Sequence, residues 1–113
     1  MIDFNKMPCI YWSDIVKASY LQRQIIIHSI IYYELNKNVI SDKKFDSISK
    51  QLISLSKKLK NEYKKTEYYY CFKDFDGNTG FYLYDSLKER DKEKCLRIAK
   101  FVLKNYRGDK NAN

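Results

Sequence analysis

Between residues 45 and 59, apolar residues recur at alternating spacings of three and four: Phe45, Ile48, Leu52, Leu55 and Leu59. Serine, lysine and glutamine fill the positions between them, so this segment predicts an amphipathic helix with one buried face. Upstream, apolar residues recur every two to four positions from Ile15 to Leu35, which predicts a long helix buried on more than one side. The β-branched residues 25–27 also suit a strand, but the length of the segment and its lack of alternation favour a helix.

A short polar connection separates the two predicted helices. Asn36 and Asn38 can end the first helix because asparagine tolerates left-handed backbone geometry, and Ser41 can cap the second. Ser13 can cap the first helix, with Asp14 favourable in its first turn. Because the connection is short, we expect the two helices to pack as antiparallel neighbours.

The second half of the chain contains two aromatic runs and a third amphipathic segment. Residues 68–72 and 81–84 flank Gly77-Asn78-Thr79-Gly80, which is compatible with a short β-hairpin or with an irregular loop pinned by its rings. A third helix is expected to begin between Ser86 and Asp91 and to end before Gly108. The expected fold is therefore mainly α: a helical hairpin plus a C-terminal helix, with an aromatic-rich loop or short hairpin between helices two and three.

A chain of 113 residues with 44% hydrophobic residues can form one modest core, so we expect a single domain over residues 1–113. Within it, the segments are a helical hairpin at 13–60, an aromatic and glycine-containing loop at 66–85, and a helix at 87–107.

No apolar run approaches the roughly 20 residues of a membrane-spanning helix, so we expect a soluble protein with no membrane partner. The N-terminus lacks the charged and then apolar pattern of a secretory signal. The cysteines have no CxxC spacing, which supports neither a zinc site nor a disulfide framework: Cys9, Cys71 and Cys95. Reduced thiols fit a cytoplasmic location, which would be the host cytoplasm if the protein is viral.

The formal net charge of +8 is compatible with nucleic-acid binding, because lysine and arginine can neutralise phosphates. Almost all of this charge is lysine, whereas arginine is the residue suited to bidentate phosphate and guanine contacts. Nonspecific nucleic-acid binding and a merely solvated lysine surface therefore both stay open.

The corner between the first two helices gathers side chains that suit a flat, hydroxyl-rich ligand. Asp42, Phe45 and Asp46 stand at i, i+3 and i+4, so they share one face of the second helix. Tyr32 and Tyr33 lie one short loop upstream. Aromatic faces can stack on a planar ring, and carboxylates can accept hydrogen bonds from ribose hydroxyls.

His28 lies one turn before Tyr32 and can reach the same corner. Structural roles also fit these residues: the tyrosines as core, Asp42 as a helix-dipole residue, Asp46 as a solvated partner of Lys50, and His28 as a satisfied structural histidine. Lone histidines on apolar helices more often have that structural role.

The order of these residues resembles a known motif. The segment from about Lys17 to Lys60 resembles the N-terminal helical subdomain of bacterial NAD-dependent DNA ligases, in which a Tyr-Tyr or Tyr-His pair precedes Pro-x-Ile-Ser-Asp-x-x-Tyr-Asp. That subdomain binds the nicotinamide mononucleotide half of NAD. The resemblance implies that five residues are counterparts of its nicotinamide-ribose contacts: Tyr32, Tyr33, Asp42, Phe45 and Asp46.

The chain also departs from that family. Asn38 stands where proline is usual, and Phe45 replaces a tyrosine, which keeps the stacking face and loses a hydroxyl. The ligase nucleophile lies in Lys-x-Asp-Gly, whereas the run from Lys73 to Gly77 has an extra residue and no adenylation domain around it. We therefore expect that the protein has no ligase activity and is not an enzyme. A lone hairpin followed by Asp-Phe-Asp-Gly-x-Thr-Gly-Phe looks like the small ligase-related proteins encoded by bacteriophages of low-GC bacteria.

The loop from Asp74 to Gly80 has three possible roles. Backbone amides of Gly77 and Gly80 and the hydroxyl of Thr79 could hold a ligand phosphate over the corner. The alternation of acidic and amide side chains resembles part of a calcium loop, but Gly77 is misplaced and no distal glutamate follows. A plain turn is the simplest interpretation, and no metal site is predicted.

These features predict a non-catalytic nucleotide-binding protein that needs no cofactor. The candidate ligands are nicotinamide mononucleotide, NAD or an ADP-ribose derivative, and a phage protein of this kind could sequester an NAD-derived immune signal of the host. One alternative is an interaction or inhibitor protein that docks on a host protein through Tyr68–Tyr70 and Tyr82–Tyr84. The other is a basic DNA-associated accessory factor. The oligomeric state stays open.

Overall fold

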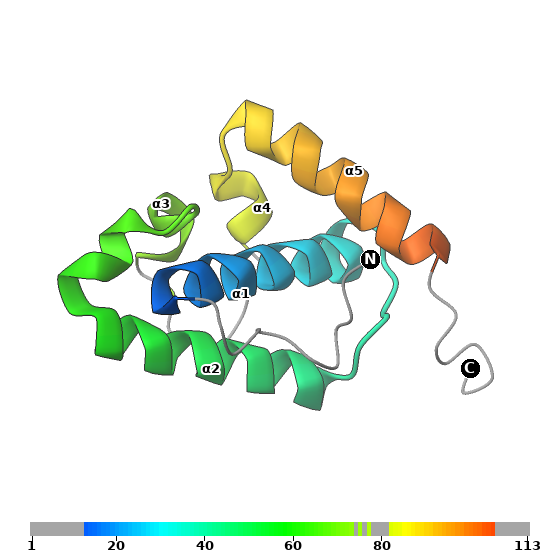
Figure 1. Cartoon of the computed structure of the whole chain (residues 1–113). Coiled ribbons are helices and arrows are strands. Elements are labelled where there is room, and N and C mark those ends of the chain that lie inside the picture. The colour runs from blue at the N-terminus through cyan, green and yellow to red at the C-terminus, as the bar shows by residue number, and fades with distance from the viewer. Residues whose placement is uncertain (1–12, 74, 76, 78–81, 106–113) are drawn as a thin grey trace.

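The structure is a computed structural model that describes residues 13–73, 75, 77 and 82–105 (Figure 1). It consists of two long antiparallel helices and a third helix packed against the first of them. Helix α1 (Asp14–Ser29) continues into a π-helical turn (Ile30–Glu34), and α2 (Asp42–Leu59) returns alongside α1. A 3₁₀ turn (Lys60–Lys65) follows, then two single-turn helices, α3 (Tyr69–Phe72) and α4 (Leu83–Ser86). Helix α5 (Glu89–Asn105) is the last described element. The mainly helical fold and the hairpin are confirmed.

Helix α1 lies between α2 on one side and α4 and α5 on the other (Figure 1). This position explains why its apolar residues do not follow a single stripe, since two layers of neighbours cover them. The core consists mainly of α1 and π-turn side chains with contributions from the other helices: Ala18, Leu21, Ile25, Ile26, Ile27, Ile30, Ile31, Leu52, Phe72, Leu83, Cys95 and Ala99. The prediction of a helix buried on more than one side is confirmed.

The helix starts follow the predicted caps. The Ser13 hydroxyl accepts a hydrogen bond from the backbone N–H of Val16 at 3.3 Å, and the Ser41 hydroxyl accepts one from Lys44 at 3.0 Å. Asn36 has a φ of 56°, the left-handed geometry that asparagine tolerates better than most residues. The connection between the two long helices is therefore fixed at both of its ends.

Replacing Ser41 with alanine is expected to lower the free energy of unfolding by about 1 kcal/mol, because one N–H of α2 would lose its partner. Urea unfolding followed by circular dichroism measures this change. The free energy of unfolding of the matched variant Ser41→Gly should fall by only a few tenths of a kcal/mol. Equal stabilities for the wild type and Ser41→Ala would mean that this cap does not stabilise the helix.

The described parts of the aromatic segment form two short helical turns. The first run forms helix α3, in which the Phe72 N–H donates to the Tyr68 carbonyl at 3.2 Å, and no strand occurs among the residues that the structure describes. Tyr68, Cys71 and Phe72 are buried together, a spacing that belongs to a helical turn and not to an alternating strand. The short β-hairpin is therefore not what the described parts of the two runs form. The expected Gly108 helix end lies outside the described residues.

A buried amide ties the segment after α2 to α1. The Gln22 side chain donates to the Thr66 hydroxyl at 2.8 Å and accepts from the Tyr68 N–H at 3.0 Å. The Thr66 hydroxyl in turn donates to the Tyr63 carbonyl at 2.7 Å. These bonds satisfy polar groups that the core would otherwise leave unpaired, and they set where α3 begins.

Candidate functional site

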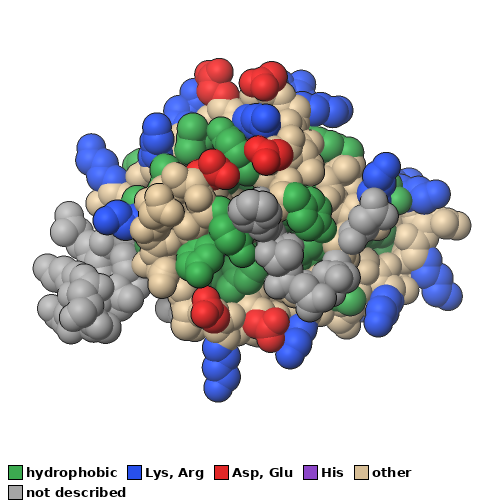
Figure 2. All heavy atoms as spheres, turned by 180° about the vertical axis from the view of Figure 1, so that it is seen from behind, with side chains coloured by type: hydrophobic (Ala, Val, Ile, Leu, Met, Phe, Trp, Pro, Cys, Tyr) green, Lys and Arg blue, Asp and Glu red, His purple; other side chains and the backbone are tan. Residues whose placement is uncertain are grey.

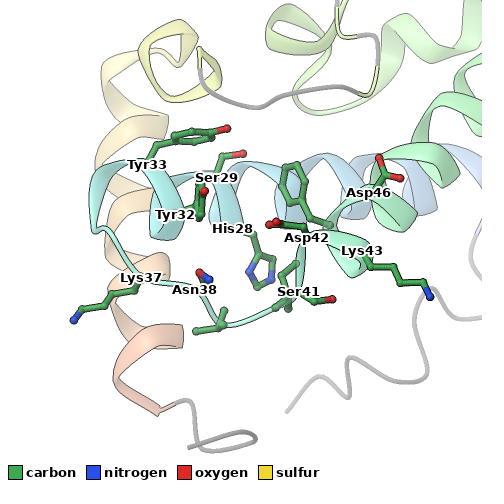
Figure 3. A pocket seen from close by; sticks show the side chains of 13 residues that line it. His28, Ser29, Tyr32, Tyr33, Lys37, Asn38, Ser41, Asp42, Lys43 and Asp46 are labelled. Carbon is green, nitrogen blue, oxygen red and sulfur yellow. The ribbon is translucent and has the colours of Figure 1, made fainter. Parts of the chain in front are cut away.

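A cavity of about 520 Å³ lies at the corner between the π-helical turn and the start of α2 (Figure 3). All of its lining residues fall between His28 and Asp46. The six ligand-binding residues that we predicted all line it: His28, Tyr32, Tyr33, Asp42, Phe45 and Asp46. Its volume is within the range of small-molecule sites in proteins, roughly 300–1,000 Å³. The structure therefore brings the predicted residues together around one hollow.

The π-helical turn positions the tyrosine pair. The Leu35 N–H donates to the Ile30 carbonyl and the Lys37 N–H to the Ile31 carbonyl, both at 3.0 Å, so each loop of backbone is wider than an α-helical turn. The rings of Tyr32 and Tyr33 meet edge to face, with centroids 4.8 Å apart and an interplanar angle of 85°. Tyr32 keeps half of its surface exposed. Single π-helical turns are frequent at functional sites, and no pattern in the sequence indicated this one.

The two carboxylates at the start of α2 have different surroundings. Asp46 pairs with Lys50 at 3.1 Å, which is the structural role considered above, and its carboxylate points away from the tyrosines in Figure 3. Asp42 forms no ion pair with any described residue, and its carboxylate points toward the tyrosine pair. Of the two, Asp42 is therefore the better placed to accept a hydrogen bond from a ligand.

Two lysines stand at the rim of the cavity. Lys37 and Lys43 both contribute to its lining, and Figure 3 shows their side chains extending outward on opposite sides. With Asp42 and Asp46, the lining carries two positive and two negative side chains. A ligand with hydroxyls at one end and a phosphate at the other can find a complementary group for each.

His28 and Ser29 form the deepest polar part of the lining. His28 is 8% exposed and Ser29 is 2% exposed. The His28 Nδ1 atom and the Ser29 hydroxyl have no hydrogen-bond partner among the described residues. Burial lowers the pKa of His28 to about 4, which keeps the ring neutral near pH 7. Ser29 was missed in the sequence, where only its place beside His28 pointed to it.

Only one of the three predicted contacts between the loop and this cavity lies among the described residues. Gly77 does not line it; a Cβ built on Gly77 would lie 3.4 Å from the Cγ1 atom of Ile53, in the middle of α2. Its φ of 90° explains why glycine suits that position. Thr79 and Gly80 lie outside the described residues, as do the side chains of the calcium-like alternation, Asp74, Asp76 and Asn78.

The tyrosines proposed as docking anchors are mostly packed within the protein. Tyr68 is completely buried, and Tyr69, Tyr70 and Tyr84 are partly buried against the core. Tyr82 is the most accessible of the residues proposed for docking, with 39% of its surface exposed. Lysine and arginine side chains are spread around the face in Figure 2 with acidic side chains among them, not gathered into one stripe.

Cys71 and Cys95 are both free and buried, and burial raises the pKa of Cys71 to about 11. Two unreactive core thiols fit this environment. Within the described part of the chain, the helices are too short or too polar to cross a membrane.

Comparison of the chain with models of protein families, with curated proteins and with solved structures gives no match. What the corner cavity can bind must therefore be judged from its own geometry and chemistry.

Proposed function

We propose that this protein binds a nicotinamide-nucleotide or ADP-ribose-type ligand in the corner cavity without transforming it. The observation that carries this function is the cavity itself, of about 520 Å³, with aromatic, acidic and basic side chains on its lining. Such a mixture suits a ligand that combines a flat ring, ribose hydroxyls and a phosphate.

Each part of the ligand has a counterpart in the lining. The flat ring would stack on the half-exposed face of Tyr32, with Phe45 on the α2 side. The Asp42 carboxylate would accept hydrogen bonds from ribose hydroxyls, and Lys37 or Lys43 would pair with the phosphate.

We infer binding without catalysis from the surroundings of the two serine hydroxyls in the lining. The Ser41 hydroxyl already accepts the Lys44 N–H as the cap of α2, and the Ser29 hydroxyl is buried. The neutral His28 is the nearest candidate base, but its Nδ1 forms no hydrogen bond with either serine of the lining. We therefore assign this site to holding a ligand.

The resemblance to the ligase subdomain and the small size of the chain suggest a biological role. A phage-encoded protein of this kind would act stoichiometrically in the host cytoplasm by sequestering an NAD-derived immune signal. That role requires tight binding, because each molecule removes one ligand and is not regenerated.

Isothermal titration calorimetry with nicotinamide mononucleotide, NAD and ADP-ribose tests the binding function. We expect at least one of them to bind, and Asp42→Asn to weaken that binding about tenfold, because an amide accepts hydrogen bonds less strongly than a carboxylate. No heat of binding with any of the three ligands would rule this function out.

Tyr32→Ala is expected to weaken binding of the same ligand about thirtyfold, the loss of one stacking contact worth about 2 kcal/mol. Because Tyr32 is half exposed, its removal should change the free energy of unfolding by less than about 0.5 kcal/mol. The matched control is Tyr82→Ala, an exposed tyrosine outside the cavity, which should bind as the wild type does. Equal affinities for Tyr32→Ala and Tyr82→Ala would contradict the stacking role.

A further inference from the structure

We propose that His28 and Ser29 form a hydrogen-bonding floor that recognises an uncharged amide on the ring of the ligand, so that the site selects carboxamide over carboxylate nucleotides. This inference rests on the proposed function and adds the chemical group by which the ligand would be chosen. Both residues line the cavity, both are more than nine-tenths buried, and each has a polar atom with no partner among the described residues.

Unpaired buried polar atoms need an explanation, because folding normally provides each of them with a partner. An unpaired buried polar atom destabilises the folded protein, and such atoms occur preferentially at functional sites. Here two of them belong to consecutive residues that line the same cavity; Figure 3 shows Ser29 beside Tyr33 and the His28 ring nearer to Ser41. That coincidence points to a ligand that supplies the missing partners.

The chemistry of the two side chains indicates which group fits. A neutral imidazole offers one donor and one acceptor, and a serine hydroxyl can donate and accept. A carboxamide also offers both, through its NH₂ group and its carbonyl oxygen, so it can pair with either residue.

A carboxylate fits the same place poorly. It only accepts hydrogen bonds, and it would bring a negative charge to a buried position on a lining that already holds Asp42 and Asp46. His28 cannot neutralise that charge near pH 7, because burial holds its pKa at about 4.

Pairing requires a local rearrangement, because both atoms are shielded in the structure. Rotating the imidazole about its Cβ–Cγ bond exchanges Nδ1 with a carbon atom of nearly the same size, and a rotation of Ser29 about χ1 turns its hydroxyl. Side-chain changes of this kind are common when a site is occupied. The backbone of α1 does not have to move.

The test compares nicotinamide mononucleotide with nicotinic acid mononucleotide by calorimetry, using the wild type, Ser29→Ala and His28→Leu. We expect the wild type to bind the amide nucleotide about tenfold or more tightly than the acid, because the carboxylate would bring an unpaired charge to a buried position. Each variant should reduce that preference to a few-fold. The ratio of the two affinities is the readout, because a merely structural disturbance would weaken both ligands equally.

Ser49→Ala is the matched control. Its hydroxyl is also buried and without a partner among the described residues, but it lines no part of the corner cavity. We expect Ser49→Ala to keep the wild-type preference, and both serine variants to melt at the wild-type temperature or a few degrees higher, since each loses an unpaired polar atom.

Two failures can be told apart. If the wild type binds both nucleotides equally, or if both variants keep its preference, the hydrogen-bonding floor is wrong and the binding function stands. If the wild type binds neither mononucleotide, nor NAD or ADP-ribose, the proposed binding function is wrong, and so is the hydrogen-bonding floor that rests on it.

Discussion

Replacing Gln22 with alanine is expected to lower the free energy of unfolding by about 4 kcal/mol, the largest effect of any single substitution considered for this protein. Gln22 is completely buried, and its side-chain amide bonds both to the Thr66 hydroxyl and to the Tyr68 N–H. Alanine would leave the Tyr68 N–H buried without a partner and would open a cavity beside it.

Urea unfolding measures this loss, and two further variants separate its causes. Gln22→Met keeps most of the volume but none of the hydrogen bonds, so it should lose about 2 kcal/mol. Gln51→Ala, an exposed glutamine on α2, should stay within about 0.5 kcal/mol of the wild type. A loss below about 1 kcal/mol for Gln22→Ala would show that this amide does not hold the segment after α2 in place.

Acidification is expected to destabilise the protein through its single histidine, by about 3 kcal/mol between pH 6.5 and pH 4. Burial lowers the pKa of His28 from 6.5 to about 4 in the folded state. Above pH 6.5, neither the folded nor the unfolded chain binds the proton. Below it, the unfolded chain takes up the proton first, so stability falls with pH until the folded state is protonated as well.

The His28→Leu variant isolates this contribution from that of the carboxylates, which begin to titrate in the same range. The difference in stability between the wild type and His28→Leu should change with pH over this window and stay constant above it. The imidazole resonances of the only histidine in the chain report its pKa directly by NMR. A pKa near 6.5 in the folded protein would contradict the burial of His28.

The long elements could be predicted because their sequences have a clear period. The alternating spacing from Phe45 to Leu59 defines the buried face of α2, and Ser41 marks its first residue through a cap that the structure contains. The crowded apolar pattern of α1 correctly indicated burial on more than one side, although it could not tell which elements cover each side.

The aromatic segment could not be predicted because its pattern has no unique period. In residues 68–72 every position is aromatic or cysteine, so strand and helix bury equally apolar faces. The choice is made by partners far away in the chain. Gln22 binds the Tyr68 N–H, and the Tyr70 hydroxyl donates to the Asp91 carboxylate at the start of α5.

The candidate site, too, could be predicted from the sequence only in part. Its stacking and acidic members stand at helical spacings that place them on one corner, so they could be listed from the sequence. The π-helical turn and the unpaired atoms of His28 and Ser29 depend on exact backbone geometry and on what packs nearby. No residue type signals either feature. Gly77, predicted as a possible contact at the same corner, lies near the Ile53 side chain of α2.

The most direct test of a ligand site at this corner is an amide ¹H–¹⁵N NMR titration of the whole chain with nicotinamide mononucleotide at near-physiological salt. We expect saturable shifts concentrated in residues 28–46, with the largest at the π-helical turn and at the start of α2. The absence of shifts, or shifts spread over the lysine-rich surface that vanish as salt is added, would contradict a ligand site at this corner.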